Sequence, residues 1–416
     1  MNIDQKTLAG RLREARESLN VTQDHVANSI GLPRTALVQI ENGSRAVSSL
    51  ELARLAHLYR RELTDFFAAE LPQRDADPSL VLYRRLADEL GDDPETKQQV
   101  QRCFDMCRDG IELEEILDRP QRVGPPFYQQ PAPRSVMDAV LQGQAVAMQE
   151  RSRLGLGDAP IPDMADLLNN IGVWASGVQL PDWMSGLFLA DPRFGVAVLV
   201  NFDHPRARKR FSYAHEFAHA LMDRDLQTNV SKRDNSNDLR EKRANAFAAS
   251  FLMPEGGVKQ FFRDLNKGQP SRIDTPMFDV AGDTWADASL RPVPGSQTIG
   301  YQDVASLADH FRVSYQAAVY RLKSIGLLSA SETTELLEKD SEATEFMEFL
   351  GMFKADELPD EDKRKRDREL VAQVAQLAIE AYRREEISRG RLMEIARTLN
   401  KPGQQLLRFA EASRKD

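Results

Sequence analysis

The stretch FSYAHEFAHALMD, residues 211–223, places His215 and His219 four residues apart in a segment with helical apolar spacing. Residues i and i+4 lie on one face of a helix, so both imidazoles can bind one metal ion. Glu216 follows the first histidine and is placed to act as general base toward a water at that metal. The pattern therefore predicts a catalytic metal site. The alternative is a pair of half-exposed helix histidines with no ligand.

Two imidazoles do not complete a catalytic zinc site, which uses three protein ligands and keeps one position open. The next candidate is Glu241, in the helical stretch NDLREKRANAFAASFLMP at residues 237–254. Asp234 and Asp238 are competing carboxylates, both expected in the preceding loop. Two histidines and one carboxylate suit Zn²⁺, with Mn²⁺ or Fe²⁺ as alternatives.

Outward from this motif, residues 135–330 combine helical and strand-like patterns. Helices are predicted over residues 136–154, 163–171, 206–222 and 237–252, and strands over 173–180, 185–191 and 195–201. The last of these strands is either a sheet edge that pairs with an extended peptide or a core strand. Residues 264–299, rich in Gly, Pro, Asp and Ser, predict a long surface loop. Residues 303–328 have a helix-turn-helix rhythm, for which structural packing is favoured over DNA reading.

The N-terminal stretch TQDHVANSIGLPRTALVQIENG, residues 22–43, has the pattern of a DNA-binding helix-turn-helix. Gly31 provides the turn, and apolar residues can pack the two helices together: Ala27, Ile30, Leu37 and Ile40. On this geometry three side chains point at base edges: Arg34, Thr35 and Gln39. Gln23 and Asn42 would contact phosphates. Residues 1–70 carry nine Lys or Arg and nine Asp or Glu, so their net charge is zero, and a protein-binding module is the alternative.

The chain has 416 residues, a length that suggests two or three domains. Its net charge of −9 argues against a protein that coats polyanions. The N-terminus shows no secretory signal and no apolar run could span a bilayer, so a cytoplasmic protein without a membrane partner is expected. Cys103 and Cys107 lie four apart in a predicted helix and indicate a reduced compartment rather than a disulfide scaffold.

Four segments are expected, in a multidomain chain that is mainly α-helical with an α+β centre. Residues 1–70 form the helix-turn-helix domain, and residues 71–134 form a helical connector that ends in a Pro-rich linker. Residues 135–330 form the metal-binding domain, and residues 331–416 form a helical C-terminal region.

Residues 8–67 resemble the phage-repressor (Xre-type) helix-turn-helix family, including the TQ opening and the IENG close. This resemblance covers the whole five-helix unit. It implies sequence-specific binding to operator DNA, commonly as a homodimer on a palindrome.

Residues 135–330 resemble the ImmA/IrrE family of metallopeptidase-like proteins. The resemblance rests on the RxRFxxAHExxH pattern ending at His219, the ExxANxFAxxxLMP pattern starting at Glu241, and the glycine-strand-VN arrangement over residues 186–201. It implies a zincin-like fold with metal ligands at His215, His219 and Glu241 and a catalytic Glu216. Ala218 stands where the family usually has glycine. Tyr213 either approaches an oxyanion of the substrate or packs in the core.

The expected function is a DNA-binding transcriptional regulator with a zinc-dependent endopeptidase domain that cleaves a regulatory protein, either itself or a related repressor. The alternative is a regulator that cuts nothing and whose metallopeptidase-like domain senses a ligand or a protein partner. A third class is an antitoxin or phage-defence regulator that acts by protein contact. The intact Glu216 favours the enzyme because a sensor does not need the base.

Overall fold

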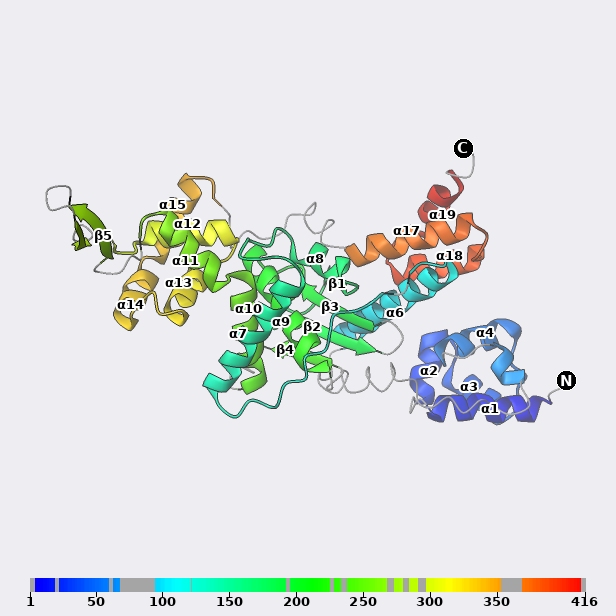
Figure 1. Ribbon diagram of the computed structural model, residues 1–416. Helices are drawn as coiled ribbons and strands as arrows, with labels where there is room; N and C mark the ends of the chain where they lie inside the picture. Colours follow the sequence, from blue (N-terminus) through cyan, green and yellow to red (C-terminus); the bar gives the residue numbers. More distant parts are fainter. Residues whose placement is uncertain are drawn as a thin grey trace. The chain divides into compact units, whose positions relative to one another are not determined.

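The computed structural model describes residues 4–18, 22–59, 63–67, 94–120, 122–191, 195–224, 228–232, 238–267, 273–279, 284–290, 297–352 and 369–412. The chain divides into two compact units, Met1–Arg85 and Leu86–Asp416, which are described separately. Figure 1 shows their helices and strands.

The described residues of the first unit form five short helices, as the resemblance to the Xre-type family implies. They are α1 (Gln5–Ser18), α2 (Gln23–Ile30), α3 (Arg34–Glu41), α4 (Ser49–Leu58) and the 3₁₀ helix η1 (Leu63–Phe67). Their apolar faces form one core, which includes the four residues predicted to pack α2 on α3: Ala27, Ile30, Leu37 and Ile40. Gly31 has a φ of +73° and turns the chain between α2 and α3 in a conformation that favours glycine.

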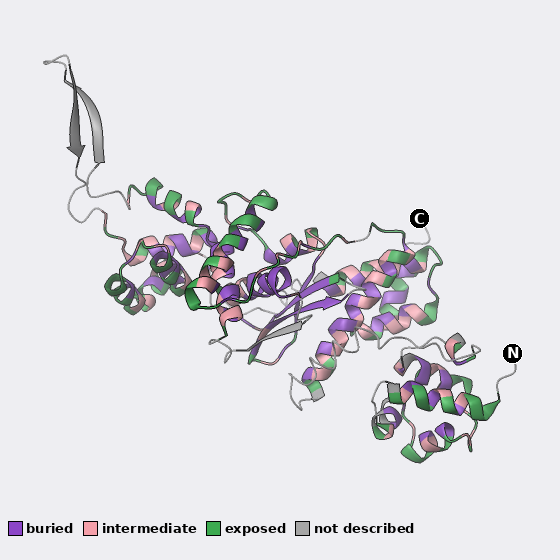
Figure 2. Ribbon diagram, turned by 60° about the horizontal axis from the view of Figure 1, so that its bottom comes forward, coloured by how far each residue is buried: buried purple, intermediate pink, exposed green. Residues whose placement is uncertain are grey.

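The centre of the second unit is a four-stranded sheet in the order β1-β3-β2-β4. Its strands are β1 (Trp174–Val178), β2 (Met184–Asp191), β3 (Gly195–Asn201) and β4 (Thr228–Lys232). β1 runs parallel to β3, whereas β2 runs antiparallel to both β3 and β4. Of the two alternatives for residues 195–201, the core strand is confirmed and the sheet edge is excluded, because β3 pairs with a strand on each side. All of its residues after Gly195 are buried, and the ribbon of the central strands is coloured as buried in Figure 2.

Three helices stack beside this sheet. α9 (Arg206–Met222) packs on β2 and β3, and α10 (Leu239–Leu252) packs between α9 and α7 (Val136–Arg153). α7 and α10 approach closely at Gly143, where an added Cβ would lie 2.3 Å from the Arg243 carbonyl oxygen. Two short helices complete this part, α8 (Met164–Asn170) and α11 (Glu255–Asp264). One apolar core cluster contains residues of β1, β2 and β3 together with residues of all five helices.

The predicted loop over residues 264–299 contains a β-hairpin, so that expectation is wrong. β5 (Ile273–Asp279) pairs antiparallel with β6 (Thr284–Leu290). The sequence predicted a loop here because Gly, Pro and Asp, which are frequent in this stretch, are rare within strands.

Between the hairpin and residue 352, the described residues form α12 (Tyr301–Phe311), α13 (Tyr315–Ser324), α14 (Ala330–Glu338) and α15 (Asp340–Phe349). The helix-turn-helix rhythm of residues 303–328 belongs to α12 and α13. Their apolar residues, including Leu307, Phe311 and Leu322, are buried in the core that also contains residues of α9 and α10.

The last helices pack against a helix that precedes the sheet by sequence. α17 (Glu369–Arg383) and α18 (Arg389–Thr398) both contact α6 (Pro94–Ile116), and α19 (Gly403–Ala412) contacts α17 and α18 (Figure 1). Arg391 joins α18 to α6 through Asp109 Oδ1 at 2.9 Å. Cys103 and Cys107 are buried on α6, and burial raises the pKa of the Cys103 thiol to about 12. The predicted fold class, mainly helical around an α+β centre, is confirmed. Within the described part of the chain, the apolar length needed to cross a membrane is not reached by any helix.

Candidate metal centre

Three predicted ligands come together on facing helices. His215 and His219 lie one turn apart on α9, and Glu241 lies on α10. The two Nε2 atoms are 3.2 Å apart, and the Glu241 carboxylate oxygens lie 3.1 Å from Nε2 of His215 and 3.4 Å from Nε2 of His219. All three residues are buried. They form the potential metal-binding group found among the described residues.

The start of α10 fixes the position of the carboxylate ligand. Asp238 is the N-cap residue of this helix, and its side chain accepts a hydrogen bond from the Arg240 backbone at 2.8 Å. Glu241 therefore lies in the first helical turn, directed at α9. Of the two competing carboxylates, Asp238 is engaged as this helix cap, and Asp234 lies outside the described residues.

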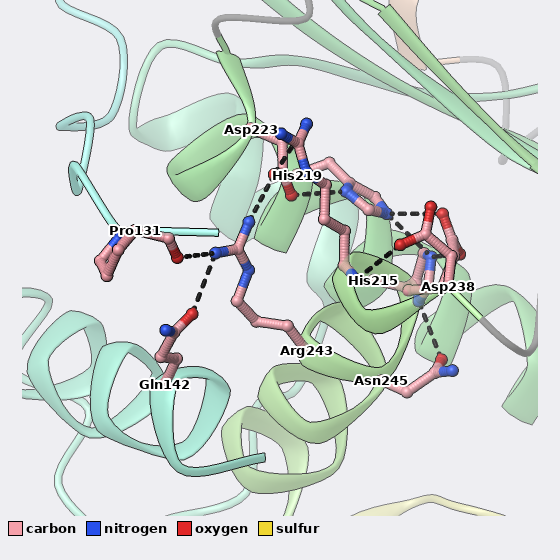
Figure 3. A network of polar contacts seen from close by, with 10 residues as sticks. Pro131, Gln142, His215, His219, Asp223, Asp238, Arg243 and Asn245 are labelled. Carbon is pink, nitrogen blue, oxygen red and sulfur yellow. Dashed lines mark hydrogen bonds and ion pairs between the residues drawn. The ribbon is translucent and has the colours of Figure 1, made fainter. Parts of the chain in front are cut away.

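Each histidine is oriented by a hydrogen bond on the far side of its ring (Figure 3). His215 Nδ1 lies 2.9 Å from Asn245 Oδ1, and His219 Nδ1 lies 2.9 Å from Asp223 Oδ2. Because both partners are oxygen acceptors, both Nδ1 atoms carry the proton in the neutral ring. The Nε2 lone pairs then point at the shared space between the three ligands.

A buried arginine supports the Asp223 side of this arrangement. The Arg243 guanidinium, on α10, donates to Asp223 Oδ1 at 2.5 Å and to Gln142 Oε1 of α7 at 3.1 Å. Figure 3 shows it between α7 and the end of α9, where the Pro131 carbonyl is a further acceptor. Sequence reasoning missed Asp223 and Asn245, although each lies four residues after a predicted ligand, the spacing that places two side chains on one helix face.

The charges of the cluster are coupled. Burial lowers the pKa of His219, but the hydrogen bond to Asp223 and the Glu241 carboxylate outweigh burial and raise it to about 10. Burial alone would raise the pKa of Glu241, yet the two histidines hold it far below its usual range. Without a metal, the cluster is therefore a buried ion pair between a carboxylate and an imidazolium.

The donor set fits a divalent metal. In a tetrahedral site with metal–ligand bonds of about 2.0–2.1 Å, neighbouring ligand atoms lie about 3.3 Å apart. The three separations of 3.1, 3.2 and 3.4 Å agree with that geometry. Two imidazoles and one carboxylate also leave a coordination position for water or substrate. These contacts support a metal without selecting between Zn²⁺ and Mn²⁺.

Glu216 and Tyr213 occupy different surroundings on α9. Glu216 is fully buried, and its side chain lies against β2 at Gly186, where an added Cβ would be 3.1 Å from Glu216 Oε1. The glycine thus provides the space for this carboxylate. Tyr213 is 7% exposed and belongs to the apolar core, an environment that favours the packing alternative. The general-base role of Glu216 stays a prediction.

The predicted DNA-contacting residues lie on and beside α3 of the first unit. Arg34, Thr35 and Gln39 are exposed, opposite the buried face of α3. Arg34 forms an exposed ion pair with Asp24 at 3.4 Å.

The two predicted phosphate contacts make hydrogen bonds within the unit. The Gln23 amide donates to Glu41 Oε2 at 2.8 Å, and Asn42 Oδ1 accepts from the Ser44 backbone at 2.9 Å. Both residues retain further polar atoms for a phosphate, so their role stays a prediction.

Comparisons with known proteins find a different family in each of the two units. Residues 170–273, which include all three ligands and Glu216, match the family of IrrE N-terminal-like domains, a peptidase family. Residues 12–66 match a helix-turn-helix family. The chain therefore carries an Xre-type helix-turn-helix domain followed by an IrrE/ImmA-like domain, as the sequence patterns predict.

Full-length comparisons add little to these family matches. No curated protein matches the chain. Among solved structures, Bacillus thuringiensis PlcR in complex with the peptide PapR7 and DNA is 10% identical and aligns over 95% of this chain and 93% of that chain, with a TM-score of 0.15. A score this low carries no argument about fold or function.

Proposed function

We propose that this chain, a helix-turn-helix domain joined to an IrrE-like domain, is a transcriptional regulator that cleaves a regulatory protein with a metal-dependent endopeptidase site. The observation that carries the proposal is the buried group of His215, His219 and Glu241, with Glu216 next to the first histidine. The substrate is a related repressor or the chain itself. Zn²⁺ is the proposed metal because it lies above Mn²⁺ in the general affinity order.

The protein residues divide the work of peptide hydrolysis between them. A divalent metal held by the three ligands would polarise the scissile carbonyl and lower the pKa of a water. Glu216 accepts the proton of the attacking water at its carboxylate and passes it to the leaving nitrogen. Asp223 and Asn245 keep both imidazoles in the tautomer that binds through Nε2. Burial of the site excludes bulk water, which strengthens each of these interactions.

The first unit determines which DNA sequence the protein binds. Arg34 and Gln39 carry the side chains that pair with guanine and adenine edges in the major groove, and Thr35 lies beside them. Gln23 and Asn42 contact the phosphates and set the register of the helix. A homodimer on a palindromic operator is the assembly that such a domain favours. Cleavage of a repressor, whether in cis or in trans, would then relieve repression at that operator.

Metal content and self-processing test this proposal together. Purified wild type, Glu216→Gln and His219→Ala are analysed for bound metal, then incubated with and without added Zn²⁺ or Mn²⁺ and examined for fragments. We expect one metal in wild type and in Glu216→Gln, little metal in His219→Ala, and fragments from wild type alone. Candidate repressors are added in a parallel incubation to detect cleavage in trans.

The possible outcomes separate the functions predicted from the sequence. Fragments that persist in Glu216→Gln would refute the catalytic assignment. Bound metal without cleavage of the chain or of any candidate repressor would support the sensor. Absence of metal after loading would refute the ligand assignment itself.

A further inference from the structure

A cleft of about 990 Å³ runs between helices of the second unit. Its walls come from α7, α9 and α10 on one side and from α13 and α15 on the other. It is separate from the three ligands, none of which lines it. Its volume is at the upper limit of the roughly 300–1,000 Å³ typical of small-ligand sites.

This cleft starts beside the metal centre. Asn245 lines it and also accepts the hydrogen bond from His215 Nδ1. Phe211 lines it as well, with its ring centroid 6.3 Å from that of His215. Phe211 precedes His215 by four residues and Asn245 follows Glu241 by four. The walls from α9 and α10 are therefore the helix faces that carry the ligands, continued away from the metal.

Much of the cleft surface is apolar, and part of it is exposed. Tyr320 and Val136 line the cleft and are 56% and 50% exposed. Beyond Glu348, which also lines it, the next two residues of the chain, Phe349 and Leu350, are 86% and 50% exposed. Contiguous exposed apolar groups beside a cavity are typical of protein interaction sites. These exposed side chains lie in the lining of the cleft and directly after it along the chain, where a polypeptide segment can cover them.

The walls also carry charges of opposite sign. Lys242 comes from α10, and Glu348 comes from α15. Neither side chain has an ion-pair partner among the residues that the structure describes. A peptide segment offers both carbonyl acceptors and amide donors along its length. The Lys242 ammonium can bind the carbonyl groups while the Glu348 carboxylate binds the amides.

We propose that the cleft binds an apolar stretch of the polypeptide substrate and holds it beside the metal centre. The inference rests on the proposed peptidase function and deepens it by naming the substrate class. A flexible segment with consecutive apolar side chains fills the cleft, while its neighbouring peptide bond reaches the space between the ligands.

Binding is measured on Zn²⁺-loaded Glu216→Gln, which cannot cut. The probe is a positional-scanning set of fluorescein-labelled decapeptides followed by anisotropy. We expect Leu, Met or Phe at two or more consecutive positions to bind about tenfold tighter than Ser or Asp there. Ala249→Arg fills the cleft and should lower the affinity at least tenfold. Ala145→Arg, exposed on α7 outside the cleft, is the matched control and should change it less than about twofold.

A second pair of variants tests the cleft independently, in case Ala249→Arg does not fold. Tyr320→Ala truncates an exposed cleft residue, and Met148→Ala truncates a residue of α7 that is 70% exposed and lies outside the cleft. Thermal unfolding and metal content are recorded for all four. Tyr320→Ala should weaken peptide binding, and Met148→Ala should not.

Parallel incubation of the same peptides with Zn²⁺-loaded wild type, read by mass spectrometry, separates two kinds of failure. Apolar-selective binding without any cleavage would support the cleft and refute the peptidase. Cleavage without apolar preference, unchanged in Ala249→Arg, would support the peptidase and refute the cleft. Peptide affinity that is independent of residue type in both cleft variants would also refute the cleft.

Discussion

Asp223→Asn tests whether the contact to His219 controls metal binding. Asp223 is 1% exposed, and both of its oxygens are engaged, Oδ2 with His219 and Oδ1 with Arg243. Asparagine has the same shape but offers one oxygen and one amino group. If the oxygen faces His219, the amino group faces the Arg243 donors. If the oxygen faces Arg243, the amino group faces Nδ1, and His219 must adopt the tautomer with a proton on Nε2.

Either arrangement makes His219 a weaker metal ligand. Loss of a hydrogen bond that orients a metal-binding histidine typically costs about 10–100-fold in metal affinity, or about 1.4–2.7 kcal/mol. The assay is competition for Zn²⁺ between the metal-free protein and a chromophoric chelator at a fixed pH. Thermal unfolding in the presence of EDTA shows separately whether the variant folds.

Asp238→Asn is the matched control because it removes the same charge from the same region. Asp238 caps α10, and asparagine caps a helix equally well, so this variant should change Zn²⁺ affinity less than about threefold. Wild-type affinity in a folded Asp223→Asn would refute the reasoning. An equal loss in both variants would assign the effect to net charge rather than to the hydrogen bond.

Three further predictions concern separate parts of the chain. Because the pKa of His219 is raised to about 10 and imidazolium cannot ligate, Zn²⁺ affinity should rise about tenfold per pH unit between about pH 6 and pH 9; an affinity independent of pH would contradict this. Gly186→Ala places a methyl group against both the Leu199 carbonyl oxygen and Glu216. In a variant shown to be folded by thermal unfolding, it should lower peptide turnover at least tenfold with metal content unchanged, whereas wild-type turnover would count against the base assignment. Gln39→Ala should weaken the binding free energy for the preferred operator by about 1–3 kcal/mol and relax the base preference at one base pair, measured by selection from random DNA. An equal loss of affinity for all DNA sequences would contradict base reading.

Local spacing was sufficient to predict the helices that position the candidate site. The helix predicted near residues 206–222 corresponds to α9, and β3 has the predicted bounds of 195–201. Strand order was not predictable from spacing, because it depends on which segments pair across the sheet. β3 therefore proved to be interior although its sequence is equally compatible with an edge.

Long-range packing escaped prediction for the same reason. Arg102 of α6 donates to the Thr398 carbonyl at 2.6 Å, across 296 residues of sequence. The apolar periodicity of α6 and α17 shows that each helix has a face to bury, without indicating the partner. The residues around the metal site differ: Asp223 and Asn245 lie at helical spacing from the ligands and could have been predicted from it.

The buried network around the ligands helps to decide whether this fold binds a metal or is a peptidase fold that has lost its metal. His219, Asp223 and Arg243 are each at most 2% exposed, and Glu241 is 6% exposed. Replacing buried ion pairs by apolar residues of similar shape typically leaves the stability of the folded protein unchanged or raises it by about 1–4 kcal/mol. A metal that binds only the folded chain offsets this cost, by about 2.7 kcal/mol at a free concentration one hundred times its Kd. The network is therefore suited to a bound metal and disadvantageous for simple packing.

Glu216 extends the argument from metal binding to catalysis. Its carboxylate is fully buried against Gly186 and is not one of the three clustered ligands. A sensor would function equally well with a neutral glutamine at this position, because the metal, the ligands and the DNA-binding unit remain. Glu216→Gln should therefore leave metal binding and DNA binding within about twofold of wild type while abolishing any metal-dependent change in operator occupancy that follows from cleavage. A metal response that survives in this variant would identify the domain as a sensor.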